Sequence, residues 1–206
     1  MVLPLKNKRM FIYNKAMRKK DENKKEAIID ATVQLSNEIG FSNISMSKIA
    51  KRADVSAATL YVYYKNKEDM FRKVYMDVKK QMIRECSQGI RQEESVEQSV
   101  RKICSNLLRY MQGHTEEFLF IEQMCNSPMA TDEMIAEIEQ LSKATNEVFQ
   151  RGIQEGILKQ STPALLISFC YYPIQQIFKE WRKEKSMLKD VDFDLIFQMC
   201  WDAIKR

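Results

Sequence analysis

Apolar side chains recur at intervals of three and four positions along most of the chain, a spacing that predicts α-helices rather than strands. The first clear helix is expected over about residues 24–39, and Gly40 supplies a C-terminal stop. Two short helices follow, one beginning at Ser45 and one at Ser56, because serine is a favoured N-cap. A longer helix is expected over about residues 66–86. With five glycines and four prolines in 206 residues there is little material for hairpin turns, so the sequence predicts an all-α fold.

Beyond a polar break at residues 88–94, the same pattern predicts longer helices. Pro163 suits the first position of one of them, and Pro173 is expected to bend that helix. The expected spans of these helices are about 95–111, 116–125, 131–152, 162–185 and 193–204.

The pattern divides the chain into an N-terminal three-helix domain and a C-terminal helical domain. Residues 1–23 carry charge without a sustained apolar face and are interpreted as a basic flexible arm. Residues 24–70 form the first domain, a connecting helix continues to about residue 86, and residues 87–206 form the second domain. The arm either adds phosphate or minor-groove contacts, or is an unstructured leader, since Met17 would give a conventional short lead-in to the first helix.

Charge is distributed unevenly between the two parts of the chain. Residues 1–80 hold 18 basic and 9 acidic side chains, whereas the rest of the chain holds 15 basic and 19 acidic ones. A basic N-terminal part joined to a mildly acidic C-terminal part indicates two tasks, one of which faces a polyanion. Basic residues that only solubilise a surface would give the same charge balance.

Candidate catalytic and metal-binding chemistry is sparse. The five cysteines are widely spaced without a CxxC pair, which argues against a disulfide framework or a zinc site and fits a reducing cytosol. His114 is the only histidine, and no GxGxxG, P-loop, HExxH or GxSxG motif is present. There is no apolar run long enough to span a membrane and no recognisable signal peptide. We therefore expect a cytoplasmic protein without cofactor, metal, membrane contact or enzymatic activity.

Two very short helices separated by a tight turn are unusual in a chain of long helices. Helices of this length persist only through packing, and Ala50, Val55 and Leu60 can bury between the pair. Small side chains open the second helix, over residues 56–61, and would let its N-terminus enter the major groove of DNA. The alternative is an ordinary helical hairpin with an aromatic core, because tyrosines at helical spacing pack more often than they recognise DNA. The residues by themselves leave both interpretations open.

Residues 25–71 resemble the DNA-binding domain of the TetR/AcrR family of transcriptional regulators. The matched features are Ile28 and Ala31, Gly40-Phe41, Ile49-Ala50, Val55-Ser56, Thr59-Leu60-Tyr61 and Lys67-Glu68. The resemblance implies a helix-turn-helix repressor, a homodimer that binds double-stranded operator DNA and is released by a small apolar or amphipathic effector. A ligand-independent activator or DNA-bound adaptor is the alternative function, and an all-α enzyme is a remote one.

The resemblance also assigns roles to individual residues of the helix-turn-helix. It places Ser45, Tyr63 and Lys67 on phosphates and Leu60 and Tyr64 in the core. The other DNA-binding candidates, at the N-cap of the recognition helix or facing bases and sugar edges, are Ser47, Ser56, Ala57, Ala58, Thr59 and Tyr61. Because the two alanines carry no polar group, base readout would depend on thymine methyls, Ser47 and Tyr61.

Two positions of this motif depart from the commonest family pattern. Asp54 stands where glycine is frequent, and aspartate tolerates the left-handed conformation that such a turn requires. Tyr63 stands where histidine is common, which keeps a hydrogen-bond donor.

In the TetR/AcrR family the C-terminal helices enclose a ligand pocket, and the last two helices pack against a second subunit. The resemblance therefore implies a pocket and a dimer contact in residues 87–206. The pocket candidates are Phe118, Met124, Phe149 and Tyr172. The dimer candidates are Ile174, Ile177, Phe178, Trp181, Phe193, Phe197 and Trp201. The same large side chains would equally suit the core of a single chain, and the pattern leaves that alternative open.

Overall fold

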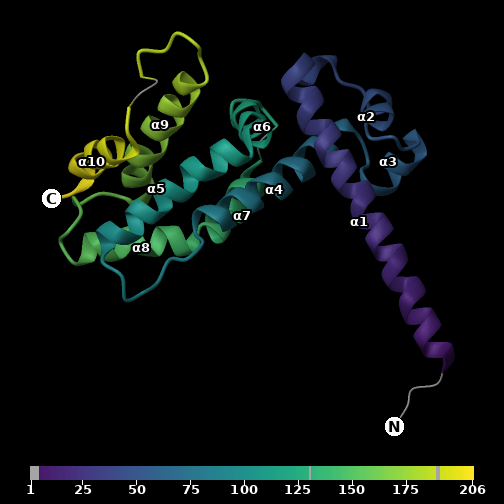
Figure 1. Cartoon of the computed structure of the whole chain (residues 1–206), viewed down its shortest axis with the longest axis horizontal. Coiled ribbons are helices and arrows are strands. Elements are labelled where there is room, and N and C mark those ends of the chain that lie inside the picture. Colours follow the sequence, from purple (N-terminus) through teal and green to yellow (C-terminus); the bar gives the residue numbers. More distant parts are fainter. Residues whose placement is uncertain (1–4, 130, 189–190) are drawn as a thin grey trace. The chain divides into compact units, whose positions relative to one another are not determined.

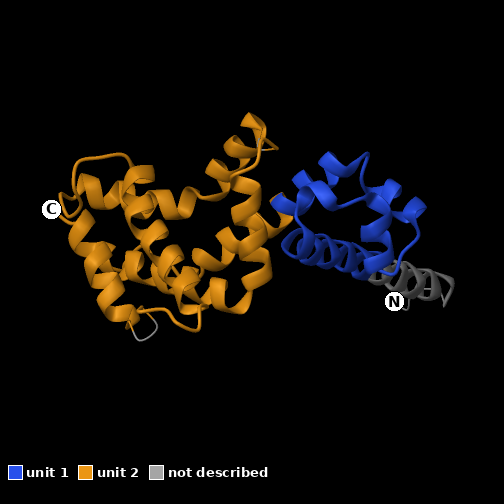
Figure 2. Cartoon of the chain, turned by 90° about the horizontal axis from the view of Figure 1, so that it is seen from above, with its two compact units in different colours: residues 1–75 blue, residues 76–206 orange. Residues whose placement is uncertain are grey.

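The computed structural model describes residues 5–129, 131–188 and 191–206, with the backbone alone for residues 5–20. The chain divides into two compact units, residues 1–75 and residues 76–206 (Figure 2). The described residues form ten α-helices and one short 3₁₀-helix and contain no β-strand (Figure 1). The predicted all-α fold is confirmed.

Unit 1 contains the helix-turn-helix. Its elements are α1 (Leu5–Ile39), the 3₁₀-helix η1 (Phe41–Asn43), α2 (Met46–Arg52), α3 (Ala57–Tyr63) and the first turns of α4 (Lys67–Cys86). Ile28 of α1, Ile49 of α2, Leu60 of α3 and Phe71 of α4 are fully buried. A bidentate ion pair joins α2 to α1, in which Arg52 donates to both carboxylate oxygens of Glu38 at 2.8 and 2.7 Å.

The first helix is longer than the apolar pattern predicts, since α1 begins at Leu5 rather than near residue 24. The basic segment expected to be a flexible arm therefore continues the helix backbone, apart from residues 1–4, which lie outside the described residues. The segment before residue 24 is rich in lysine, arginine, methionine and alanine, which favour a helix even where they form no continuous apolar face. A prediction based on the spacing of apolar residues therefore misses a helix of this composition.

Unit 2 contains the second part of α4 and six further helices. They are α5 (Val96–Gly113), α6 (Thr115–Cys125), α7 (Asp132–Leu141), α8 (Lys143–Gln154), α9 (Pro163–Trp181) and α10 (Phe193–Ile204). Helix α5 packs against α6, α8, α9 and α10, and Val100 and Met111 on it are fully buried (Figure 1). Helices α9 and α10 also pack against one another.

Two helix boundaries in unit 2 differ from the predicted ones. The helix expected over residues 131–152 is divided at Ser142, which ends α7 and precedes α8. Serine is a poor residue for a helix interior, because its hydroxyl competes for backbone hydrogen bonds, but the apolar period continues across this break. Helix α9 ends at Trp181 instead of residue 185. Pro173 lies inside the helix, as the sequence predicts.

The predicted helix starts are confirmed by capping geometry. The hydroxyls of Ser45, Ser56, Ser95 and Thr162 each accept a hydrogen bond from a backbone N–H in the first turn of the helix that follows. Asn66 does the same for α4 through its side-chain oxygen, 2.8 Å from the N–H of Asp69. These five starts are encoded locally, which is why the sequence predicts them.

Candidate DNA-contacting surface and effector cavity

The turn between α2 and α3 is held by local geometry. Asp54 has a φ of 52°, in the left-handed region that its sequence position indicates. The N–H of Val55 then donates to the carbonyl of Ala50 at 3.0 Å, which closes the turn. Ala50 and Leu60 are buried as predicted, so α2 and α3 form a packed pair.

Helix α3 presents small and apolar side chains to solvent. Ala57 and Ala58 are exposed at its start, and Ser47 is exposed on α2. Tyr61 is 58% exposed and Val62 is 79% exposed, whereas Leu60 and Tyr64 are core residues, as the family resemblance implies. Sequence reasoning missed Val62, although its position four residues after Ala58 places both on one helix face.

Several candidate polar residues at this surface already have partners within unit 1. The Ser45 and Ser56 hydroxyls accept the N-cap bonds, and Ser56 also shares a hydrogen bond of 2.8 Å with Thr59. The Tyr63 hydroxyl donates to the Asp21 carboxylate of α1, and this hydrogen bond is the main cause that raises the pKa of Tyr63. Tyr63 is therefore held in place from α1.

Lys67 is half-buried, and its ammonium forms hydrogen bonds within unit 1 where the resemblance implies a phosphate contact. Its Nζ donates to the carbonyls of Phe41 at 2.9 Å and Ile44 at 3.0 Å, which ties the start of α4 to η1 and the residue that follows it. The neighbouring Lys65 is exposed. We therefore correct the expected phosphate contact of Lys67: the cation is used inside unit 1, and Lys65 remains accessible to an anion.

A cavity of about 580 Å³ lies within unit 2, between residues of α4, α5, α7, α8 and α9. Of the four pocket candidates, Phe149 and Tyr172 line it. Phe118 and Met124 are instead buried in the core, where the Phe118 ring packs edge-on against Phe178 with centroids 5.6 Å apart. The pocket assignment is corrected for these two residues.

Helix α4 supplies one wall of the cavity through Lys79, Met82, Ile83 and Cys86. These residues lie beyond the helix-turn-helix motif, in a segment the sequence suggests only as a connector. The sequence shows that Met82 and Ile83 are apolar, but the helices that face them are determined by tertiary packing. Sequence reasoning therefore had no signal for this wall.

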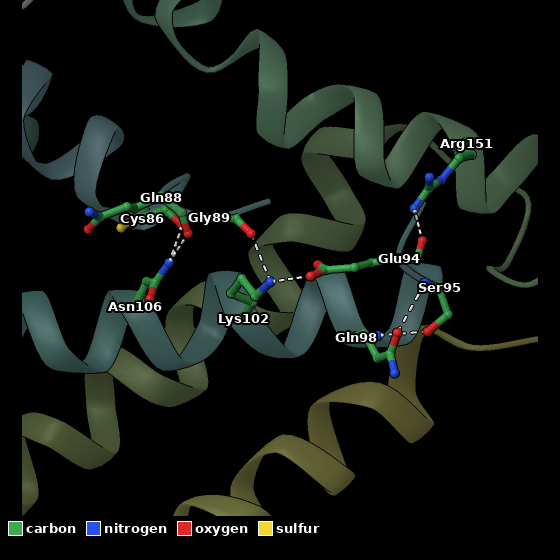
Figure 3. A network of polar contacts seen from close by, with 9 residues as sticks. All are labelled: Cys86, Gln88, Gly89, Glu94, Ser95, Gln98, Lys102, Asn106 and Arg151. Atoms are coloured by element: carbon green, nitrogen blue, oxygen red, sulfur yellow. Dashed lines mark hydrogen bonds and ion pairs between the residues drawn. The ribbon is translucent and has the colours of Figure 1, made fainter. Parts of the chain in front are cut away.

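The end of α4 is fixed to α5 by polar contacts (Figure 3). The Asn106 side-chain amide donates to the carbonyls of Cys86 at 3.2 Å and Gln88 at 3.0 Å. Lys102 donates to the carbonyl of Gly89 at 2.8 Å and forms an ion pair with Glu94. The loop after α4 is thus anchored along α5.

A second tie reaches the same loop from α8. Arg151 donates to the carbonyl of Glu94 at 2.8 Å (Figure 3). It also donates to the carbonyl of Gln92. The following residue, Gly152, packs so closely against Leu158 and Val96 that an added Cβ would lie 2.6–2.8 Å from their side chains. The loop between α4 and α5 is therefore held from both sides.

The dimer candidates divide by burial. Ile174, Phe178, Phe197 and Trp201 are at most 5% exposed within the single chain, so their side chains are already covered. Ile177, Trp181 and Phe193 are partly exposed. The large apolar side chains that do reach the surface of α9 and α10 are different ones, namely Leu165, Phe169, Tyr172, Leu195 and Met199. The core alternative for the four buried residues is correct.

Comparisons with known proteins agree with this architecture. Residues 28–74 match the bacterial regulatory proteins of the tetR family, and residues 75–206 match the tetracyclin repressor-like C-terminal domain. The chain is 29% identical to a TetR family transcription regulator from Marinobacter aquaeolei VT8, whose crystal structure aligns with a TM-score of 0.82 over 91% of this chain and 98% of that one.

Two further similarities are to a fatty acid metabolism regulator and to a regulator bound to stearoyl-CoA. The chain is 25% identical to the fatty acid metabolism regulator protein of Bacillus subtilis (strain 168), over 82% of this chain and 86% of the relative. Its fold is similar to that of the transcriptional regulator FadR from Bacillus subtilis in complex with stearoyl-CoA, with 22% identity and a TM-score of 0.64 over 86% of this chain and 95% of that one.

The helix-turn-helix and the matched domains define a DNA-binding transcriptional regulator. The chain belongs to the TetR family. Across the described residues, we find no helix that is both long and apolar enough to cross a membrane.

Proposed function

We propose that this chain is a transcriptional repressor that leaves its operator when an apolar or amphipathic small molecule fills the cavity of unit 2. The observation that carries the proposal is the continuity of α4, which begins at Lys67 in unit 1 and lines the cavity from Lys79 to Cys86. In unit 1, Phe71 of this helix packs edge-on against Phe41 with ring centroids 5.0 Å apart. A ligand that displaces the cavity wall therefore acts on a helix embedded in the DNA-binding unit.

For DNA binding, we propose that α3 enters the major groove with its exposed face towards the bases. The proposed contacts are Ser45, Ser47, Ser56, Ala57, Ala58, Thr59, Tyr61 and Tyr63, to which the exposure of Val62 and Lys65 adds two. Ala57, Ala58 and Val62 offer methyl groups of the kind that contact thymine. Lys65 takes the place of Lys67 as the phosphate contact, because its ammonium is not occupied by backbone carbonyls.

For assembly, we propose a homodimer formed through α9 and α10. The exposed residues Leu165, Phe169 and Tyr172 recur on one face of α9, and Leu195 and Met199 lie on α10, which packs against it. Contiguous exposed apolar residues of this size indicate a covered surface. A two-fold dimer would present two copies of α3 to two half-sites of an inverted repeat.

For the effector, an acyl compound is the best-supported class. The cavity volume of about 580 Å³ is within the range of small-molecule sites, and most of its wall is apolar. The fatty acid metabolism regulator and the stearoyl-CoA complex among the similar proteins point to the same class.

The proposal is tested with the purified full chain in two steps. Selection from random duplexes should recover an inverted repeat, and fluorescence anisotropy on that repeat then measures affinity as acyl compounds are added. An effector should weaken operator binding by about 5- to 150-fold, and operator should weaken effector binding by the same factor. A compound that fills the cavity and leaves operator affinity unchanged would favour the ligand-independent regulator instead. In vitro transcription from a promoter carrying the repeat separates repression from activation.

A further inference from the structure

Lys79 is a cation without a partner in the wall of the cavity. Its side chain lines the cavity, and among the residues that the structure describes none forms an ion pair or hydrogen bond with it. Its neighbour on α4, Lys80, pairs with Glu137 at 2.6 Å. Burial lowers the pKa of the Lys79 ammonium, which shows that the protein around it compensates its charge poorly.

The groups around Lys79 do not neutralise it. The pKa of Lys79 responds to the Cys86 and Cys125 thiols, and burial raises the pKa of Cys86 to about 12, so that this thiol is neutral at physiological pH. Glu139 also lines the cavity, but its side chain is exposed and forms no ion pair with Lys79. The positive charge at this position is therefore open to a ligand.

Tyr171 supplies a second unused donor to the same cavity. Its hydroxyl has no hydrogen-bond partner in the described part of the chain, and its ring lies edge-on to Tyr172 with centroids 5.4 Å apart. Burial raises the pKa of Tyr171, so the hydroxyl keeps its proton. Tyr171 and Lys79 both line the cavity, so the two donors belong to the same site.

Most of the remaining wall is apolar. Met82 and Ile83 of α4, Ile103 and Leu107 of α5 and Phe149 of α8 line it. An ammonium and a phenol beside an apolar chamber form a site with one polar and one apolar region. Such a site fits an amphiphile rather than a purely apolar or purely polar molecule.

We propose that the cavity binds a single-chain anionic amphiphile, whose head group accepts hydrogen bonds from Lys79 Nζ and the Tyr171 hydroxyl while its tail lies along the apolar wall. This inference rests on the proposed function, because it specifies the charge and shape of the effector. The physical reason is that an unpaired ammonium that has lost part of its hydration is costly, and an anion that pairs with it offsets that cost. A neutral molecule of the same length leaves the cost in place.

The first test compares head groups at constant tail length. Dodecanoate, dodecanol and dodecylamine, each below its micelle concentration, are titrated into the full chain by calorimetry. Dodecanoate should bind at least tenfold more tightly than dodecanol, and dodecylamine should bind most weakly. Equal affinity for the acid and the alcohol would overturn the inference.

The second test removes the cation. In Lys79→Met the preference for dodecanoate over dodecanol should fall below about twofold, whereas Lys79→Arg should keep it. Lys80→Met is the matched control, since it removes a lysine one position away that is already paired with Glu137. Tyr171→Phe should weaken dodecanoate binding several-fold without abolishing it. Retention of the full preference in Lys79→Met would refute the role of Lys79.

A stability measurement shows whether Lys79→Met has a folding defect. Removing this partly buried, unpaired charge should raise the urea midpoint of the ligand-free chain, because the pKa of Lys79 is lowered in the folded state and the unfolded chain binds its proton more strongly. The same reasoning predicts that the stability advantage of the variant shrinks as pH rises towards the ordinary pKa of lysine. A lowered midpoint at neutral pH would instead assign Lys79 a structural role and contradict the proposal.

Two comparisons complete the design. Lauroyl-CoA carries its negative charges on phosphates and has a neutral thioester, so loss of its binding in Lys79→Met would identify phosphate as the anion and retention would identify a free carboxylate. Operator release is measured separately from binding. If dodecanoate binds in a Lys79-dependent manner but leaves operator affinity unchanged, the anion site stands and the proposed repressor mechanism fails. If alcohol and acid bind equally and both release operator, the mechanism stands and the anion site fails.

Discussion

Substitution of Lys67 by methionine distinguishes a structural lysine from a phosphate-binding one. Methionine keeps the length and apolar stem of the side chain but removes the ammonium that donates to the carbonyls of Phe41 and Ile44. A hydrogen bond from a charged donor contributes about 1.5–3 kcal/mol when buried. Lys67 is only partly buried, and the Phe41 carbonyl also accepts a 3.4 Å bond from the N–H of Ile44, so we expect a loss of about 1–2 kcal/mol in total.

The assays for this substitution are urea unfolding and the salt dependence of operator binding. At a slope of about 2 kcal/mol per molar urea, in the middle of the usual range, the midpoint should fall by roughly half a molar to one molar. Hydrogen exchange should locate the loss in η1 and the start of α4. The slope of log affinity against log salt should stay unchanged in Lys67→Met and should flatten by about 0.9 per protomer in the control Lys65→Met. Unchanged stability with a flattened slope in Lys67→Met would refute the structural role and restore the phosphate contact.

Three further substitutions test the packing and the DNA surface. Gly152→Ala should lower the urea midpoint by an amount equivalent to about 1–3 kcal/mol, because its Cβ would collide with Leu158 and Val96; no change would mean that these side chains can move aside. Asp54→Gly should stabilise the chain by up to about 1 kcal/mol in thermal melting, since glycine adopts a φ of 52° without strain, and a destabilised variant would show that the aspartate side chain matters more. Tyr61→Phe should weaken operator binding by about 1 kcal/mol in anisotropy titrations while leaving the melting temperature unchanged, because its ring is 58% exposed; a stability loss instead would identify a core aromatic.

The parts of the structure that the sequence predicts are those encoded over a few residues. The starts of α2, α3, α5 and α9 follow from Ser45, Ser56, Ser95 and Thr162, whose hydroxyls can reach only the next few backbone N–H groups. The left-handed turn at Asp54 follows from the limited set of residues that tolerate it. Local chemistry of this kind is readable without knowledge of the rest of the fold.

The parts that sequence reasoning missed depend on partners far away in the chain. Phe118 is an aromatic of the expected type for a pocket, but Phe178, sixty positions later, covers it. Lys67 is a lysine at a helix start, and only the position of two carbonyls more than twenty residues earlier turns its ammonium inward. Lys79 stands beside Lys80 in the sequence, yet Glu137 pairs with one and not the other. No periodic pattern carries these pairings.

The geometry of α4 indicates how a small change in the cavity could reach the DNA-binding unit. Asn106 holds the helix at Cys86, and Lys79 and Lys67 lie successively farther from that fixed end. At a rise of about 1.5 Å per residue, Lys79 is roughly 10 Å and Lys67 roughly 28 Å from Cys86 along the axis. If the helix tilts as a rigid rod about its anchored end, a shift of about 1 Å at Lys79 becomes nearly 3 Å at Lys67. A given force at Lys79 exerts a larger torque about the fixed end than the same force at Ile83, because Lys79 lies farther from Cys86. Since the spacing of half-sites is set by the DNA, a shift of this size at each α4 would be enough to misplace the recognition helices of a dimer.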